Sequence, residues 1–232
     1  MLIRGQCTTL SDAGATKFAI LVDLDGTIVN SGPGIIDSYQ HALRYMGVEC
    51  PSAEDLTWVI GPPSRRSFPK LIRPDQDVEE AVRLYREHYA EYGILNGTIY
   101  SGMREALAEV YALPARLFVC TAKVQSFAEK IIEYLGLNYL FERVYGADPD
   151  GKFDDKGLLI EHIMRVEQID PTRTVMVGDR ANDMLAAARH AIPGVGALWG
   201  YGNEDELVAA GATTLCPSPY DLAATVRRLL QV

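Results

Sequence analysis

Short apolar runs alternate with longer amphipathic stretches over most of this chain. The first run, Phe18–Val22, is typical of a fully buried strand, and it ends abruptly at Asp23 and Asp25. Residues two apart in an extended chain face the same side, so these carboxylates would share one side if the strand continued. Gly26 then allows a sharp turn. Because buried acids are costly, we expect the pair to have a chemical role.

The stretch from residue 30 to residue 96 shows helical spacing and no convincing strand. Its first helix carries apolar residues at helical intervals from Ile35 to Met46, and Gly47 is a plausible end. Further helical patterns follow at 52–59, 64–72 and 77–92. The sequence therefore predicts an all-helical insertion in this region.

After residue 97, helical and strand patterns alternate, which favours βαβ units and a parallel sheet. Helices are expected at 103–111, 124–135 and 156–166. Strands are expected at 116–120, 143–146, 174–177, 194–198 and 213–216. Together with Phe18–Val22 these make a sheet of about six strands, which is a usual size. The predicted fold class is therefore α/β with a parallel sheet.

Polar residues stand at the ends of three expected strands and at the start of one helix: Asp23 and Asp25, Thr121, Asp179 with Asp183, and Lys156. Parallel strands align their carboxyl ends at one edge of a sheet, where α/β proteins bind ligands, so these groups can meet in one cleft. Each of them alone is more typical of a turn, a cap or packing. Together, in this order, they provide the groups that phosphoryl transfer needs.

The chemistry of the acids suggests distinct roles. Asp23 could attack phosphorus with one oxygen and hold Mg²⁺ with the other, and Asp179 would be a second metal ligand. Asp25 could bind the metal through its backbone carbonyl. Its side chain would then be free to protonate the leaving oxygen and later to deprotonate water.

The remaining polar groups suit a bound phosphate. The Thr121 hydroxyl and the backbone N–H groups of Ala122 and Gly26 could donate to phosphate oxygens. Lys156 could stabilise negative charge on the nucleophile and on the phosphoryl group. Asp183 could bind a metal-held water or orient Lys156, and it could equally be a helix cap.

These residues resemble the motifs of the haloacid dehalogenase-like (HAD) hydrolase superfamily. Asp23–Thr27 matches its first motif, Thr121 its second, Lys156 its third, and Asp179 with Asp183 its fourth. The resemblance implies a Rossmann-like three-layer core with an inserted helical cap of the C1 type, and Mg²⁺ as cofactor. The expected boundaries are 1–29 and 97–232 for the core and 30–96 for the cap.

Within the superfamily the chain is most similar to the phosphoglycolate-phosphatase-like group, partly through the loop Gly61–Pro63. The resemblance implies a phosphatase for a small phosphorylated metabolite, with phosphoglycolate as the first substrate to consider. A 5'-nucleotidase, a sugar-phosphate phosphatase and a β-phosphoglucomutase-like mutase are alternatives. Dehalogenases of the superfamily lack the second aspartate, because halide departure needs no acid, so Asp25 argues against dehalogenation.

Two alternatives belong to other classes. A receiver-like signalling domain also uses an aspartate, Mg²⁺, a threonine and a lysine to hold phosphate. The helical insertion and Asp25 would have no purpose in such a domain, which disfavours it. A non-catalytic binding protein on the same fold is the other alternative, and the complete set of catalytic residues argues against it.

The expected cap contains a local basic cluster of Arg65, Arg66, Lys70 and Arg73. Most of these side chains fit a solvated helix face. Arg65 or Arg66, nearest the Gly-Pro-Pro loop, could bind a substrate carboxylate or a nucleotide. Lys123, just after Thr121, is ambiguous, because it could face phosphate or start a helix at the surface.

The composition of the chain limits the kinds of molecule that it is expected to bind. The net charge of -9 argues against nucleic acid and anionic membranes, since both reward a basic surface. The segment Met1–Thr16 lacks the apolar core of a signal peptide, and no apolar run is long enough to span a bilayer. We therefore expect a cytoplasmic protein, a monomer or weak dimer, acting on a small metabolite.

Overall fold

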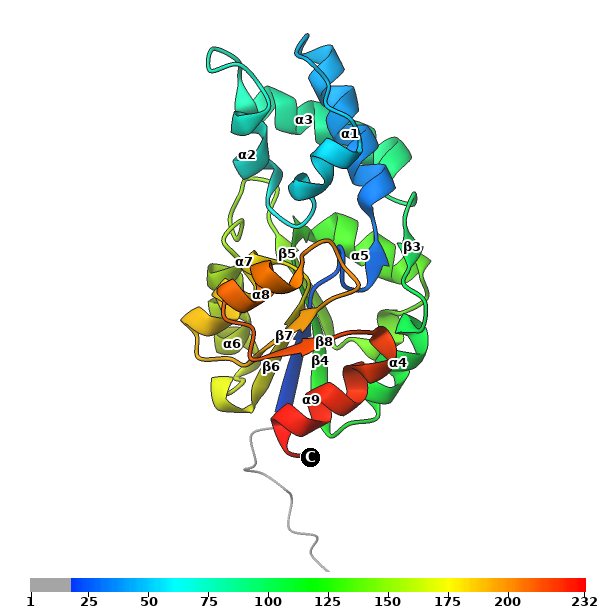
Figure 1. Ribbon diagram of the computed structural model, residues 1–232, viewed down its shortest axis with the longest axis vertical. Coiled ribbons are helices and arrows are strands. Elements are labelled where there is room, and N and C mark those ends of the chain that lie inside the picture. Colours follow the sequence, from blue (N-terminus) through cyan, green and yellow to red (C-terminus); the bar gives the residue numbers. More distant parts are fainter. Residues whose placement is uncertain (1–17) are drawn as a thin grey trace, which may run out of the picture.

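The computed structural model describes residues 18–232, so the expected lead-in Met1–Thr16 lies outside the described residues. Its main sheet has six parallel strands in the order β5-β4-β1-β6-β7-β8 (Figure 1). The strands are β1 (Phe18–Val22), β4 (Ala115–Val124), β5 (Arg143–Ala147), β6 (Thr174–Gly178), β7 (Gly194–Ala197) and β8 (Thr214–Cys216). The predicted α/β class is confirmed, and β1 lies in the middle of the sheet.

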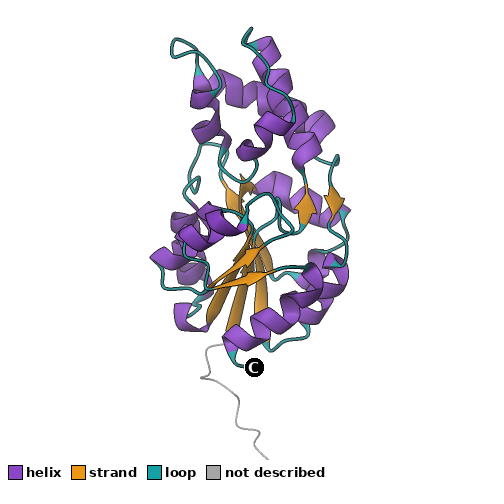
Figure 2. Ribbon diagram, viewed as in Figure 1, coloured by secondary structure: helices purple, strands orange, loops and turns teal. Residues whose placement is uncertain are grey.

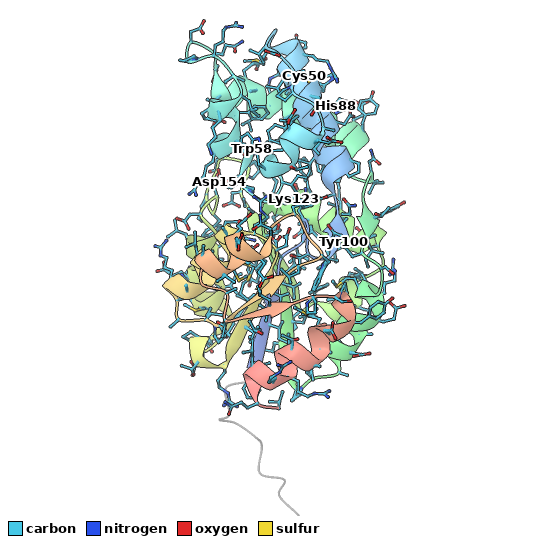
Figure 3. All side chains as sticks on the ribbon, viewed as in Figure 1. Cys50, Trp58, His88, Tyr100, Lys123 and Asp154 are labelled. Atoms are coloured by element: carbon cyan, nitrogen blue, oxygen red, sulfur yellow. The ribbon has the colours of Figure 1, made fainter. Side chains whose placement is uncertain are left out.

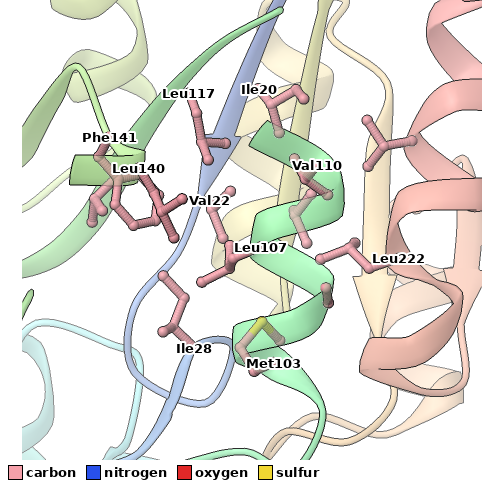
Figure 4. Close-up of a cluster of buried hydrophobic side chains, with 14 of the residues drawn as sticks. Ile20, Val22, Ile28, Met103, Leu107, Val110, Leu117, Leu140, Phe141 and Leu222 are labelled. Carbon is pink, nitrogen blue, oxygen red and sulfur yellow. The ribbon is translucent and has the colours of Figure 1, made fainter. Parts of the chain in front are cut away.

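Helices cover both faces of the sheet and make a three-layer core. One face packs against α4 (Met103–Tyr111), α5 (Gln125–Tyr134) and α9 (Leu222–Leu230), and the other against α6 (Lys156–Glu167), α7 (Ala181–Arg189) and α8 (Glu204–Ala209). Alternation along β1 divides its side chains between the faces, with Ile20 and Val22 on the α4 side (Figure 4). Burial of each such side chain stabilises the fold by roughly 1.5–3 kcal/mol.

The region between residues 32 and 93 is helical and lies beyond the carboxyl ends of the strands (Figure 1). Its elements are α1 (Gly32–Tyr45), the 3₁₀ helix η1 (Glu54–Val59), α2 (Ser64–Ser67), the 3₁₀ turn η2 (Phe68–Lys70), α3 (Val78–His88) and the π-helical turn η3 (Tyr89–Gly93). Tyr39, Phe68 and Tyr89 are the largest fully buried side chains of its separate hydrophobic core. The helix expected at 64–72 is divided because Pro69 lacks an N–H donor.

Two very short strands connect the helical region to the core. β2 (Val29–Asn30) and β3 (Thr98–Ile99) pair antiparallel where the chain leaves the core and returns to it (Figure 2). We call this pair the hinge ribbon. The sequence did not predict it, since two residues carry no periodic pattern. No helix within residues 18–232 is long and apolar enough to cross a membrane.

Candidate active site

A buried cluster of three carboxylates and one lysine lies at the carboxyl end of β1. Asp23 follows β1, Asp179 follows β6, and Asp183 lies in the first turn of α7, with one oxygen of each within 4.8 Å of the others. Lys156, the first residue of α6, donates a hydrogen bond from Nζ to Asp23 Oδ1 at 2.7 Å and another to Asp183. The parallel sheet thus brings together four residues that the sequence analysis selected.

Burial determines the electrostatics of this cluster. Burial raises the pKa of Asp23 to about 7, and the attraction of Lys156 only partly opposes this effect. Burial likewise raises the pKa of Asp179 well above its usual value, and the neighbouring Asp183 adds to the rise. Burial disfavours a charged lysine, yet Asp183 and Asp23 raise the pKa of Lys156 above its usual value, so it stays protonated. Asp23 and Asp179 therefore ionise less readily than ordinary carboxyl groups, and a further cation beside them would favour their charged forms.

Gly26 turns the chain directly against Asp179. Its φ is +88°, and a Cβ at this position would lie 2.1 Å from Asp179 Oδ2. Thr27 Oγ1 donates to Asp179 Oδ1 at 3.2 Å, and the Tyr201 N–H donates to Oδ2 at 2.8 Å. The Gly26 N–H itself donates to Val29 O at 2.8 Å. The Gly26 N–H, which was expected to bind phosphate, therefore donates within the turn in this structure. The missing side chain of Gly26 leaves space for Asp179.

The two acids of the first motif have different cationic partners. The strand ends at Val22, so both acids lie in the turn that follows it. Asp25 Oδ2 lies 3.0 Å from Lys123 Nζ, whereas Asp23 binds Lys156. Asp25 Oδ1 is buried without a hydrogen-bond partner among residues 18–232. This oxygen is suited to accept or hold a proton for a ligand.

An irregular register at the end of β4 positions the residues expected to bind phosphate. The strand extends to Val124, beyond its expected end, and its pairing with β5 shifts between Cys120 and Val124. Such irregularities redirect side chains near active sites. Buried Thr121 accepts a hydrogen bond at Oγ1 from the Lys123 N–H at 3.2 Å. The Lys123 side chain faces the site, because its Nζ contacts Asp25, and this was one of its two expected positions.

A cavity separates Asp25 from the helical region. Its volume is about 50 Å³, which is room for only a few water molecules. The core contributes Asp25, Ala122, Lys123, Val124, Phe127 and Asp154, and the helical region contributes Ile35, Tyr39, Val59, Gly61–Ser64, Tyr85 and Arg86. Figure 3 shows Lys123 at this junction. A substrate larger than phosphate would require the two parts to separate.

The arginines expected to select the substrate lie elsewhere. Arg65 binds both oxygens of Glu79, at 2.6 and 2.8 Å, and also donates to Pro149 O. Among the described residues, neither Arg65 nor Arg66 lines the cavity above Asp25, whereas Arg86 does. Burial lowers the pKa of Arg86. The sequence could have indicated this position of Arg86. Arg86 precedes Tyr89 by three residues, so the two share a face of the predicted helix.

The arrangement suits both a divalent cation and a phosphate ester. The buried carboxyls of Asp23 and Asp179 offer the hard oxygen ligands that Mg²⁺ prefers, and Asp183 lies close beside them. Asp23 and Asp25 offer a nucleophile and a separate proton-transfer group. The residues present therefore fit a magnesium-assisted phosphoryl transfer.

A family model and a solved structure both relate this chain to the same family of proteins. The family model described as haloacid dehalogenase-like hydrolase matches residues 20–197. A predicted phosphatase from Clostridium acetobutylicum has a crystal structure that superposes with a TM-score of 0.87 at 28% identity, covering 92% of this chain and all of that one. The expected superfamily and its Rossmann-like core are confirmed.

Curated relatives carry several activity names. A 5'-nucleotidase from Pseudomonas aeruginosa is 34% identical, covering 96% of this chain and 99% of that protein. A phosphoglycolate phosphatase from Thiobacillus denitrificans is 25% identical, with coverage of 90% and 96%. The tyrosine-protein kinase PtkA from Mycobacterium tuberculosis is 32% identical, with coverage of 88% and 70%.

Proposed function

The chain belongs to the haloacid dehalogenase-like hydrolases and is a phosphatase, and we propose that it cleaves small phosphomonoesters through an aspartyl-phosphate formed on Asp23. The observation that carries this proposal is the buried cluster of Asp23, Asp179, Asp183 and Lys156, next to which Asp25 lines a small cavity. We also propose that residues 30–96 act as its cap, with residues 1–29 and 97–232 as the core.

In the first step, Asp23 would attack phosphorus and displace the substrate oxygen. Asp25, whose Oδ1 is buried without a partner in the described chain, would supply the proton to that leaving oxygen. The Thr121 hydroxyl and Lys156 would hold the phosphoryl oxygens. The products of this step are a free alcohol and a phosphorylated Asp23.

In the second step, water would attack the phosphorus of the aspartyl-phosphate. Asp25 would now accept a proton from that water, and inorganic phosphate would leave with Asp23 restored. Closure of the cap would keep other water from the site while the intermediate exists. The cavity volume of about 50 Å³ supports a closed state of this kind.

Asp23 and Asp179 are the side chains that would hold Mg²⁺, together with the backbone carbonyl of Asp25. When bound, Mg²⁺ supplies positive charge that reduces the repulsion between a carboxylate nucleophile and an anionic phosphate. Asp183 would support the site by holding Lys156, since one of its oxygens contacts that lysine and the other accepts from the Arg180 N–H at 3.0 Å.

We propose a chemical class of substrate and not a single compound. The phosphoglycolate phosphatase and 5'-nucleotidase relatives favour phosphoglycolate and nucleoside monophosphates, and sugar phosphates and a mutase reaction remain alternatives. Arg86 in the cavity wall supports a substrate with a second anionic group, and Tyr85 beside it supports a flat ring. The kinase-named relative adds protein tyrosine as a phosphoryl acceptor to be tested.

The experiment is phosphate release from a panel containing phosphoglycolate, nucleoside monophosphates and sugar phosphates, with and without Mg²⁺. We expect release that depends on Mg²⁺ and is lost in Asp23→Asn. Asp205→Asn, at an exposed position of α8, is the matched control and should keep full activity. A correctly folded Asp23→Asn protein with full activity would remove the mechanism. Cytoplasmic location and a monomeric or weakly dimeric state remain predictions.

A further inference from the structure

The loop after β7 contacts both the carboxylate cluster and the hinge ribbon. Its sequence is Leu198-Trp-Gly-Tyr-Gly-Asn203, and none of the motifs described above includes Tyr201. Trp199 Nε1 donates a hydrogen bond to Thr27 O at 2.9 Å, beside the turn that supports Asp179. The loop is therefore fixed to the core at the edge where the proposed reaction takes place.

The backbone of this loop fits closely against Asp179. The Tyr201 N–H donates to Asp179 Oδ2 at 2.8 Å. A Cβ on Gly200 would lie 2.3 Å from Asp179 Cβ, and a Cβ on Gly202 would lie 2.0 Å from Asp179 O. A shift of Asp179 would therefore also shift Tyr201, because no free space separates them.

The side chain of Tyr201 extends from this contact to the cap connection. Its Oη accepts a hydrogen bond from the Gly32 N–H at 2.7 Å and donates one to Asn30 Oδ1 at 2.5 Å. Asn30 ends β2 in the hinge ribbon, and Gly32 begins α1 of the cap. Burial raises the pKa of Tyr201 to about 12, so the hydroxyl keeps the proton that it donates.

We propose that Tyr201 is a positioning residue that couples the metal-binding carboxylate Asp179 to the cap hinge. Its backbone follows Asp179 while its hydroxyl holds Asn30 and Gly32, so one residue connects the two. This inference rests on the proposed function, because it takes Asp179 as a ligand of Mg²⁺. A cation that fixes Asp179 would thereby stabilise one position of the hinge, and a cap movement would disturb the metal site in return.

The test is amide hydrogen exchange across residues 29–35, measured without substrate and with or without Mg²⁺, while calorimetry follows Mg²⁺ binding to the same protein. In the wild-type chain Mg²⁺ should slow exchange at the hinge, including the Gly32 amide, by roughly three- to tenfold, the effect of about one hydrogen bond. Tyr201→Phe should abolish this Mg²⁺-dependent difference while it still folds. Asn30→Ala, which leaves Tyr201 intact, should reduce it.

Tyr145→Phe is the matched control, because it removes a buried tyrosine hydroxyl that binds Glu167 away from the hinge. This variant should keep the full Mg²⁺ effect. The inference is overturned if Mg²⁺ binds and the wild-type hinge does not respond, or if Tyr201→Phe keeps the whole response. A wild-type chain that binds no Mg²⁺ would instead contradict the proposed metal site, so the two failures are distinguishable.

Discussion

Lys156 Nζ donates a hydrogen bond to Asp23 Oδ1 at 2.7 Å, and both side chains are buried. The same ammonium contacts Asp183, so a single lysine holds two of the three clustered carboxylates. Removing one partner of a buried ion pair leaves the other charge uncompensated, which is more costly than never burying the pair. Lys156 is therefore expected to matter for stability as well as for reaction.

Lys156→Met should lower the free energy of unfolding by about 3–5 kcal/mol and the turnover rate by roughly 100-fold or more. Urea unfolding and steady-state kinetics measure the two effects. The control is Lys130→Met, an exposed lysine of α5, which should change stability by no more than about 0.5 kcal/mol. Equal effects of the two substitutions would refute the assigned role.

Gly26→Ala should displace Asp179, because the added Cβ would lie 2.1 Å from Asp179 Oδ2. We expect roughly a 100-fold loss of activity, as is typical when a catalytic group moves by about 1 Å. Gly136→Ala is the matched control, since its φ is +65° and nothing lies within 4 Å of the added Cβ. It should cost about 1–2 kcal/mol of stability from its backbone conformation alone and keep full activity.

Mg²⁺ affinity should fall as pH decreases below 7. Burial raises the pKa of Asp23 to about 7, and the metal must displace the proton that this carboxyl then carries. The expected loss is up to about tenfold per pH unit for each carboxyl that must give up a proton, and the pKa of Asp179 is raised as well. Calorimetric titration from pH 5.5 to pH 8 measures this loss. An affinity independent of pH in this range would contradict a protonated Asp23 in the metal-free protein.

The same pKa predicts how the stability of the metal-free protein depends on pH. The pKa of Asp23 is about 7 in the folded protein, compared with the ordinary value of 3.8 that applies to the unfolded chain. The folded state therefore binds this proton more tightly. Its contribution to stability is therefore complete below pH 3.8 and is lost as pH rises through 7. Asp23→Asn should flatten this part of the unfolding profile, and an unchanged profile would show that Asp23 does not titrate there.

Lys123 should connect cap closure to the reaction, because its Nζ lies 3.0 Å from Asp25 Oδ2 and donates to Tyr89 Oη at 2.8 Å. Tyr89→Phe removes the cap partner only, and we expect KM to rise by roughly three- to tenfold with a smaller change in kcat. Lys123→Met should reduce kcat as well, since Asp25 loses its cation. Tyr92→Phe, an exposed neighbour, should leave both constants unchanged.

Much of the fold and most of the cluster follow from local patterns. The apolar run Phe18–Val22 became the central strand, and Asp23 and Asp179 meet because parallel strands end at one edge, where α6 also begins with Lys156. Such residues can be found from sequence because each stands at a boundary of a periodic element. The helix at 64–72 was wrong in its extent, because Pro69 interrupts it.

Contacts made between distant loops could not be predicted in this way. The role of Tyr201 depends on two hydrogen bonds to residues about 170 positions earlier, and no local pattern records them. Arg86 replaces Arg65 at the cavity because Glu79 pairs with Arg65, and side-chain pairing of this kind depends on packing between helices. We propose that contacts of this kind select the substrate, which would explain why the reaction was easier to predict than the substrate.

The central claim is the covalent step on Asp23, and an accumulating intermediate tests it most directly. Asp25→Asn can still react with p-nitrophenyl phosphate, whose leaving group needs no acid, but lacks the base for hydrolysis of the intermediate. After incubation with Mg²⁺ and acid quenching, peptide mass spectrometry should find one phosphoryl group on Asp23, absent when Asp23 is also replaced by Asn. A phosphoryl group on another residue, or undiminished hydrolysis by Asp23→Asn, would contradict the account.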